Sequence, residues 1–420
     1  MPGDRVYAPF ERLLSEPVRN GIYKSKDFHG RGAKIVNMGE LFAHPRLRPV
    51  AMKRVELTPA EQGRFALNAG DLLFARRSLV AEGAGKCSIV LDVDTPTVFE
   101  SSIIRARPDP AQADPEYLYY FFNSPPGLHR LDTIRRHAAV AGITGTDLSK
   151  LEIPFPPLPE QHAIAHILGA LDDSIEVNLR LNETREEIAQ ALFRSWFADF
   201  DPAPDGWSTG RLGDLVERRV ERCDASEQTA AQPYVPIDCI APKSLTLMAS
   251  KPGSEARSSL TRFYRRDILF GAVRPYFHKV CIAPFDGTTR TTVFVLTPRR
   301  DEDFSFAALL LRRPSTIDYA TRHSTGTTIP YAAWARSLAE MEVVIPPPAL
   351  RAAFDRRVRA ILERSLTPYF ENRALASMRD TLLAGLMSGE IQVKDADRFL
   401  GSAGDSHASR ASAATWLGRS

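Results

Sequence analysis

Two segments of the chain carry apolar residues at alternating spacings of four and three, which is the pattern of a helix with one buried face. In the first segment the stripe consists of Ile164, Leu168, Leu171 and Ile175, and then Leu179, Ile188, Leu192 and Trp196. In the second it consists of Leu350, Phe354, Val358 and Ile361, and then Leu375, Met378, Leu382 and Leu386. The pattern predicts two helices of about 40 residues, each spanning roughly 55 Å at 1.5 Å per residue.

Shorter apolar runs precede both helices, and they occur twice. "GDLLFARR" at 70–77 is similar to "RDILFGAVR" at 266–274, and Asp71 and Asp267 lie 196 positions apart. "LEIPFPP" at 151–157 is similar to "MEVVIPPP" at 341–348, and Ile153 and Ile345 lie 192 positions apart. Two anchors with nearly the same offset indicate an internal repeat. Each "DLLF" or "DILF" run is typical of a buried strand that ends at a basic loop.

The repeat predicts an α+β fold with two pseudo-repeated mixed α/β domains that are joined by two long coiled-coil helices. If a pseudo-two-fold axis relates the two copies, the helices must be antiparallel. The proline blocks stiffen the exit from each domain into its helix. We expect the domains at 1–156 and 201–346 and the helices at 157–200 and 347–393. Asn178 and Asn182 in the first stripe could set the helix register, or could belong to a solvated face. Residues 394–420, rich in Ala, Ser and Gly, are expected to form a mostly disordered tail.

Composition narrows the class of protein. With 44% hydrophobic and 25% charged residues, the chain is globular, and a net charge of +3 permits nucleic-acid binding without requiring it. The four cysteines are far apart and include no CxxC, which argues against a disulfide framework or a zinc site. The sequence shows neither an export signal nor a charge-free window long enough for a membrane span. These features predict a cytoplasmic protein.

Several of these segments resemble one known family. The stretch from Ile153 to Pro202, "IPFPPLPEQHAIAHILGALDDSIEVNLRLNETREEIAQALFRSWFADFDP", is similar to the first long-helix region of type I restriction-modification specificity subunits. "GWSTGRLGDL", "RDILFGAVRPYFHKVCIAPFDG" and "MRDTLLAGLMSGEI" resemble the same family, so the likeness runs from about Asn20 to Val393. One departure is in the second proline block, which reads Pro348, Ala349 and Leu350 in place of the "PEQ" at 159–161.

The resemblance implies a DNA specificity subunit of a type I restriction-modification complex, with two target-recognition domains that each read one half of a split site in double-stranded DNA. It implies that the helices recruit two methyltransferase subunits and, through them, translocase-nuclease subunits. The chain itself would be non-catalytic and would bind no cofactor directly, because S-adenosylmethionine, ATP and magnesium belong to the partner subunits that methylate adenine. The expected partner-binding helix positions are Ile164, Leu168, Leu171, Ile175, Leu192, Trp196, Phe354, Val358, Ile361, Leu382 and Leu386.

Candidate DNA contacts lie mainly in the basic loops after the paired strands. Arginine can bind guanine through two hydrogen bonds, lysine suits phosphate, and tyrosine can contact a base or sugar. These candidates are Arg76, Arg77 and Lys86 in the first domain and Arg274, Tyr276, His278 and Lys279 in the second. Secondary candidates are Lys24, Lys26, Arg257, Arg262, Arg265 and Arg266. The alternative is that these loops are simply solvated turns, with Tyr276 in the core.

Other motifs give little support for catalysis. His162 and His166 are four apart, but no Glu follows the first His as in a zinc protease. "GAGKC" at 83–87 lacks the residues of a phosphate-binding loop, and neither an amino-methyltransferase signature nor a D…ExK nuclease arrangement stands out. Two alternatives stay open: a coiled-coil scaffold protein whose globular ends bind protein, and a self-contained methyltransferase or nuclease with unrecognised motifs.

Overall fold

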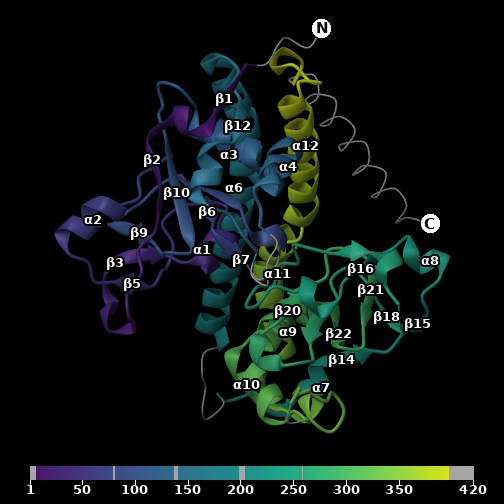
Figure 1. Ribbon diagram of the computed structural model, residues 1–420. Coiled ribbons are helices and arrows are strands. Elements are labelled where there is room, and N and C mark those ends of the chain that lie inside the picture. The colour runs from purple at the N-terminus through teal and green to yellow at the C-terminus, as the bar shows by residue number, and fades with distance from the viewer. Residues whose placement is uncertain are drawn as a thin grey trace. The chain divides into compact units, whose positions relative to one another are not determined.

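The computed structural model describes residues 6–78, 81–136, 141–197, 204–257, 259–326 and 328–396. The chain divides into two compact units: unit 1 is Met1–Asp173 with Ala376–Ser420, and unit 2 is Ser174–Leu375 (Figure 1). The predicted disordered tail lies outside the described residues from position 397 onward. Among the described residues, no helix combines the length and the hydropathy needed to cross a membrane.

Unit 1 is built on a five-stranded sheet in the order β2-β10-β6-β8-β4, in which only β4 and β8 pair in parallel. A three-stranded sheet has the order β5-β3-β9, and β1 pairs with β12 and β7 with β11. The strands are β1 (Tyr7–Pro9), β2 (Leu14–Asn20), β3 (His29–Val36), β4 (Arg46–Leu47), β5 (Arg54–Val55), β6 (Leu72–Ala75), β7 (Arg77–Ser78), β8 (Cys87–Val90), β9 (Thr97–Phe99), β10 (Ile103–Pro108), β11 (Ala141–Gly142) and β12 (Glu152–Pro154). The helices within the domain are α1 (Met38–Ala43), α2 (Pro59–Phe65), α3 (Pro115–Asn123), α4 (Pro125–Thr133) and α5 (Gly145–Ser149).

Unit 2 has a four-stranded sheet, β14-β22-β19-β20, and a five-stranded sheet, β15-β18-β21-β16-β17, while β13 pairs with β23. The strands are β13 (Ser208–Arg211), β14 (Val216–Arg219), β15 (Arg222–Cys223), β16 (Pro233–Tyr234), β17 (Lys251–Pro252), β18 (Leu260–Phe263), β19 (Ile268–Gly271), β20 (Val280–Ile282), β21 (Gly287–Arg290), β22 (Val293–Pro298) and β23 (Glu342–Ile345). The helices within the domain are α7 (Leu212–Leu215), α8 (Glu227–Ala230), α9 (Phe304–Leu311) and α10 (Pro314–Arg322), with single 3-10 turns at η6 (Pro275–Phe277), η7 (Asp301–Asp303) and η8 (Leu338–Glu340).

The two units repeat one strand arrangement, which confirms the predicted α+β repeat. The run β2-β10-β6-β8 of unit 1 has the same order and pairing as β14-β22-β19-β20 of unit 2. The phenylalanines of "DLLF" and "DILF" hold the same register: Phe74 lies opposite Ile104, and Phe270 lies opposite Phe294. Every residue of β6 and β19 is buried, as the apolar runs predict.

A buried aspartate explains why both strands begin with the same acidic residue. The Asp71 carboxylate accepts a hydrogen bond from the Asn68 amide at 2.8 Å and pairs with Arg107 at 2.7 Å. In unit 2 the Asp267 carboxylate accepts from the Tyr264 amide at 2.8 Å and pairs with Arg219 at 3.0 Å. A buried carboxylate needs such partners, so the aspartate orders the turn that leads into the central strand.

The two long segments after the proline blocks differ in continuity. The first is a single helix of 40 residues, α6 (Leu158–Phe197), as the apolar stripe predicts. The second, predicted as one helix, is two: α11 (Pro348–Arg364) and α12 (Pro368–Ser388). The interruption comes just before Pro368, because a proline lacks an N–H to donate to the helix and disfavours helical backbone at the residue before it.

The helices are antiparallel, and polar pairs set their register. In unit 2 the Asn178 side chain donates to Asn372 Oδ1 at 2.8 Å, Asn182 donates to the Ser365 carbonyl at 3.4 Å, and Phe193 lies against Phe354. The residue numbers of the contact partners fall as the residue numbers along α6 rise, so α6 runs in the opposite direction to α11 and α12. These contacts support a register role for the two asparagines.

Each long helix is tied at its first turn to the domain that precedes it. The Gln161 side chain donates to the Pro156 carbonyl at 2.8 Å and accepts from the Asp114 amide at 2.9 Å. In the second copy Arg351 donates to the Pro346 carbonyl at 3.0 Å and forms an ion pair with Asp303. Arg351 therefore occupies the position of Gln161, and the second block keeps this anchor without the "PEQ" sequence.

The core of unit 2 is shared by the domain and the helices. Phe193 and Phe197 of α6, Phe354 of α11 and Phe306 of α9 form one aromatic cluster with ring centroids 4.8 to 6.0 Å apart. The four side chains are at most 6% exposed. Edge-to-face contacts between such rings add to the burial of their apolar area.

Replacing Phe354 by Ala is expected to lower the free energy of unfolding by about 3 to 5 kcal/mol, because a fully buried ring is replaced by a cavity. The matched control is Phe370→Ala on α12, where the ring is 52% exposed and the loss should stay within about 0.5 kcal/mol. Denaturant unfolding of the intact chain measures both variants, and equal shifts would contradict the shared core.

Candidate nucleic-acid interface

In unit 2 the loop after the central strand is a tight turn held from several sides. Arg274 (φ 49°) and His278 (φ 54°) adopt left-handed backbone on either side of η6. The Arg274 amide donates to the Pro330 carbonyl at 2.7 Å, and the His278 carbonyl accepts from the Lys243 amide at 2.8 Å. Left-handed backbone is unfavourable for residues other than glycine, so these bonds hold the turn in a conformation that the chain alone would not favour.

The four candidates in this turn divide into two exposed and two anchored side chains. Arg274 and Tyr276 are exposed, and Tyr276 therefore is not in the core. His278 is 8% exposed, and its Nε2 lies 2.8 Å from the Arg312 carbonyl, while Lys279 Nζ donates to the Ile237 carbonyl at 2.9 Å. Phe277, which the sequence reasoning missed, is 45% exposed and lies beside Tyr276 at 4.8 Å between ring centroids.

The corresponding loop of unit 1 holds its candidates differently. Arg77 on β7 is exposed. Arg76 is partly buried and donates to the Ser101 carbonyl at 3.3 Å, and the Lys86 ammonium lies 5.1 Å from the centroid of the Phe42 ring. Arg77 is thus the candidate of this loop whose side chain is most accessible.

Three of the six secondary candidates have acidic neighbours. Lys24 pairs with Glu61 at 2.7 Å, Arg262 lies 3.7 Å from Glu221, and Arg266 pairs with Asp301 at 2.7 Å and lies 3.5 Å from Glu363. Lys26, Arg257 and Arg265 are exposed. Arg266 also lies over the Phe304 ring, 4.8 Å from its centroid, so its described contacts are those of a structural residue.

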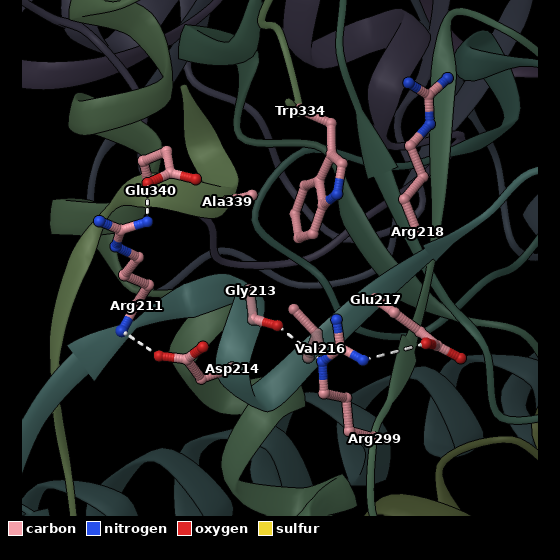
Figure 2. Close-up of a pocket in the computed structure, with 10 residues that line it drawn as sticks. All are labelled: Arg211, Gly213, Asp214, Val216, Glu217, Arg218, Arg299, Trp334, Ala339 and Glu340. Atoms are coloured by element: carbon pink, nitrogen blue, oxygen red, sulfur yellow. Dashed lines mark hydrogen bonds and ion pairs between the residues drawn. The ribbon is translucent and has the colours of Figure 1, made fainter. Parts of the chain in front are cut away.

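A hollow of about 410 Å³ in unit 2 is lined by charged side chains that largely pair with one another (Figure 2). Arg211 pairs with Glu340 at 2.5 Å, and Arg299 lies 3.3 Å from Glu217 and donates to the Gly213 carbonyl at 2.7 Å. Arg218 differs, because among the described residues it has no carboxylate partner and lies over the Phe294 ring, 4.4 Å from the centroid. Burial lowers its pKa. Sequence reasoning gave no signal for this half-buried cation.

The residues of the predicted helix stripes pack mainly inside the chain. Ile164, Leu168, Leu171, Phe354, Val358, Leu382 and Leu386 are at most 7% exposed, and Ile175, Leu192, Trp196 and Ile361 are partly buried. A second set on α6 faces outward: Val177 at 46%, Leu181 at 45% and Ile188 at 46% exposure. The prediction that Ile188 belongs to the buried stripe is therefore wrong, and Leu179, also predicted there, is 37% exposed. The three residues of the second set follow one another at intervals of four and seven residues, which places them on one face of the helix. This spacing could be read from the sequence. We call Val177, Leu181 and Ile188 the outer face of α6.

The chemistry of these surfaces is that of binding. The part of the chain that the structure describes holds no group of three or more His, Cys, Asp or Glu side chains placed to bind a metal ion. His162 lies 3.6 Å from Asp114, which accounts for one member of the histidine pair. Exposed guanidinium groups and exposed rings on braced turns are suited to phosphates and base edges.

Residues 19–187 match the family of the type I restriction modification DNA specificity domain. The chain is 28% identical over 311 residues to the specificity subunit of the type I restriction enzyme MjaIX from Methanocaldococcus jannaschii, covering 67% of this chain and 70% of that protein. It is 24% identical over 409 residues to the HindI specificity subunit from Haemophilus influenzae, and the match covers 79% of this chain and 88% of that protein. The chain belongs to the family of type I restriction-modification specificity subunits.

The fold agrees with this assignment. The crystal structure of a type I restriction-modification S subunit from M. genitalium superposes with a TM-score of 0.57 at 16% identity and covers 91% of this chain and 96% of that chain. A specificity subunit is the non-catalytic DNA-specificity component of its system and works within a type I restriction-modification complex. The family binds no cofactor itself, since the partner subunits use them. Of the three hypotheses, the specificity subunit is therefore favoured over the scaffold and the self-contained enzyme.

The buried imidazole of His278 makes the stability of this specificity subunit depend on pH. Burial lowers the pKa of His278, nearby Arg312 and Lys243 lower it further, and the hydrogen bond to the Arg312 carbonyl and the charge of Asp318 oppose the shift. The folded chain thus takes up this proton less readily than the unfolded chain. The contribution of His278 to stability is present above its ordinary pKa of about 6.5 and is lost as pH falls through the lower folded pKa.

Denaturant unfolding across that pH range should therefore show a decline that is smaller in His278→Asn than in the natural protein. An NMR titration of the imidazole supplies the pKa directly. Equal pH dependence of the two proteins, or a pKa of His278 at or above its ordinary value, would contradict the assignment.

Proposed function

We propose that this specificity subunit reads a split site in double-stranded DNA with two target-recognition domains, 1–156 and 201–346, and that helices at 157–200 and 347–393 join them. The observation that carries the proposal is the repeat of one strand arrangement with the same register in both units. A chain that carries one recognition fold twice, with different loops on each copy, is suited to two different short sequences. The bases between the two sequences need not be contacted.

Base reading is assigned to the loops that follow the central strands. Arg77 in the first domain and Arg274 with Tyr276 in the second are exposed there, and arginine can donate two parallel hydrogen bonds to guanine O6 and N7. Arg76 and Lys86, and the secondary candidates Lys24, Lys26, Arg257, Arg262, Arg265 and Arg266, are proposed to contact the sugar-phosphate backbone where their ion pairs leave an N–H group accessible. Arg218 joins them as a candidate phosphate contact.

The outer face of α6 is the proposed docking surface for methyltransferase subunits. The inner stripe is already used within the chain, whereas the outer face leaves three aliphatic side chains about half exposed on a well-formed helix. Aliphatic side chains in register on one helix face are typical of contacts with another helix. Two methyltransferase subunits, and translocase-nuclease subunits through the complex, complete the proposed assembly in the cytoplasm. S-adenosylmethionine, ATP and magnesium are then used in those partners.

A subunit that reads a split site sets which sequence the host methylates. Single-molecule sequencing of host DNA with and without this gene is expected to show loss of N6-methyladenine from one motif that has two specified blocks around an unspecified spacer. The control restores the gene on a plasmid and should restore methylation. Methylation that persists without the gene, while the neighbouring methyltransferase is expressed, would contradict the proposal.

Charged residues on the outer face of α6 should prevent docking of the methyltransferase subunit. A variant with Val177→Asp, Leu181→Asp and Ile188→Asp places three charges in a contact that must lose water, so copurification with the methyltransferase subunit should fall about tenfold or more. The side chains are exposed, so the fold and DNA binding by the isolated subunit should be retained. The matched control is Leu179→Asp, which lies on α6 outside this face. Equal losses in both variants would contradict the assignment.

A further inference from the structure

The turn at 274–279 presents two aromatic rings from a backbone that is fixed on both sides of them. Within the turn the Phe277 amide donates to the Arg274 carbonyl at 3.0 Å and the His278 amide to the Pro275 carbonyl at 2.7 Å. Outside it, the turn is bonded to the segments at Ile237, Lys243, Arg312 and Pro330. The Gly271 amide donates to the Lys279 carbonyl at 2.8 Å and ties the end of the turn to β19.

The bracing leaves three side chains of this turn exposed, Arg274, Tyr276 and Phe277, and the last two present apolar rings. They are 50% and 45% exposed, although burial of two adjacent rings would have been favourable. The left-handed backbone at Arg274 and His278 costs free energy, which the hydrogen bonds around the turn must offset. A strained, rigid turn that exposes apolar rings is typical of a contact surface arranged before binding.

We propose that Tyr276 and Phe277 form an apolar wedge that stacks against the bases of the half-site read by the second domain. His278 and Lys279 are positioning residues: their side chains bond to the protein backbone and hold the rings outward. This inference rests on the proposed function and adds Phe277 to the residues that determine specificity. It also changes the expected role of His278 and Lys279 from DNA contacts to supports.

The charges around the turn favour DNA over a protein partner. Arg274 and Lys243 are exposed cations on segments bonded to the turn. Arg312, which receives the His278 bond, lies 3.8 Å from the buried carboxylate of Glu186, and Asp318 is the acidic group that acts on His278 from the neighbouring helix α10. Lys243 can meet a phosphate beside a base step while Arg274 and the two rings contact the bases.

The test compares specific and nonspecific binding by the complex assembled with its methyltransferase subunits. Two duplexes are used, one with the split site found by sequencing and one with its second block scrambled, over a series of salt concentrations. The double variant Tyr276→Ala with Phe277→Ala is expected to lose about tenfold or more in affinity for the specific duplex, because stacking contacts are lost. Affinity for the scrambled duplex and the salt slope should not change, because no phosphate contact is removed.

Five comparisons complete the design. Lys243→Ala should lower affinity for both duplexes and reduce the salt slope, because it removes a phosphate contact. Phe370→Ala, which removes an equally exposed ring elsewhere, should leave both affinities unchanged. His278→Ala should lose discrimination without changing the salt slope, and His278→Gln, which keeps an N–H donor, should recover part of it. With 2-aminopurine in the second block, binding of the natural complex should raise fluorescence, and the double variant should not.

Each remaining outcome overturns the inference. An unchanged preference in the double variant shows that the rings do not contact the bases. Failure of the variant to assemble with the methyltransferase, while the isolated subunit keeps its DNA preference, assigns the rings to a protein interface. If the natural complex itself does not distinguish the two duplexes, the proposed function fails first, and the wedge fails with it.

Discussion

The hydrophobic core that each domain shares with the long helices is the constraint on which the rest of the structure depends. In unit 2, Phe193 and Phe197 of α6 and Phe354 of α11 pack with Phe306 of α9, so the domain lacks part of its core without the helices. In unit 1, Ile164 and Leu168 of α6 are buried. The helices are therefore part of what allows each domain to fold, in addition to joining the two copies.

Buried polar contacts link α6 to the proposed reading turn within unit 2. The Glu186 carboxylate accepts hydrogen bonds from the Leu245 and Thr246 amides at 2.9 and 3.0 Å, which fixes the segment that follows Lys243. Lys243 in turn bonds to the His278 carbonyl. A buried carboxylate satisfied by backbone donors resists displacement, because moving it leaves several polar groups unpaired. The helix that exposes a docking face thus also braces the turn that exposes the aromatic pair.

Much of the architecture was predictable because the repeat is carried by local patterns. "DLLF" and "DILF" are buried strands in equivalent positions, and the stripe from Ile164 to Trp196 is one helix. The break before Pro368 was missed because the apolar stripe continues on both sides of it, although the proline itself was a readable signal. The role of Arg351 was missed because its chemistry differs from that of Gln161, and only the shared acceptor reveals that the two are equivalent.

The sequence by itself determined the repeat, the fold class and the family, because strand runs, helix stripes and motif likeness depend on residues close together in the chain. The tertiary structure decided which candidate side chains are accessible. His278 and Lys279 bond to carbonyl groups of segments more than 30 residues away, whereas Tyr276 and Phe277 between them are exposed. Likewise, the inner and outer faces of α6 are both apolar, and packing within the chain selects the one that is buried. Exposure depends on contacts between distant segments, and such contacts exist only once the chain has folded.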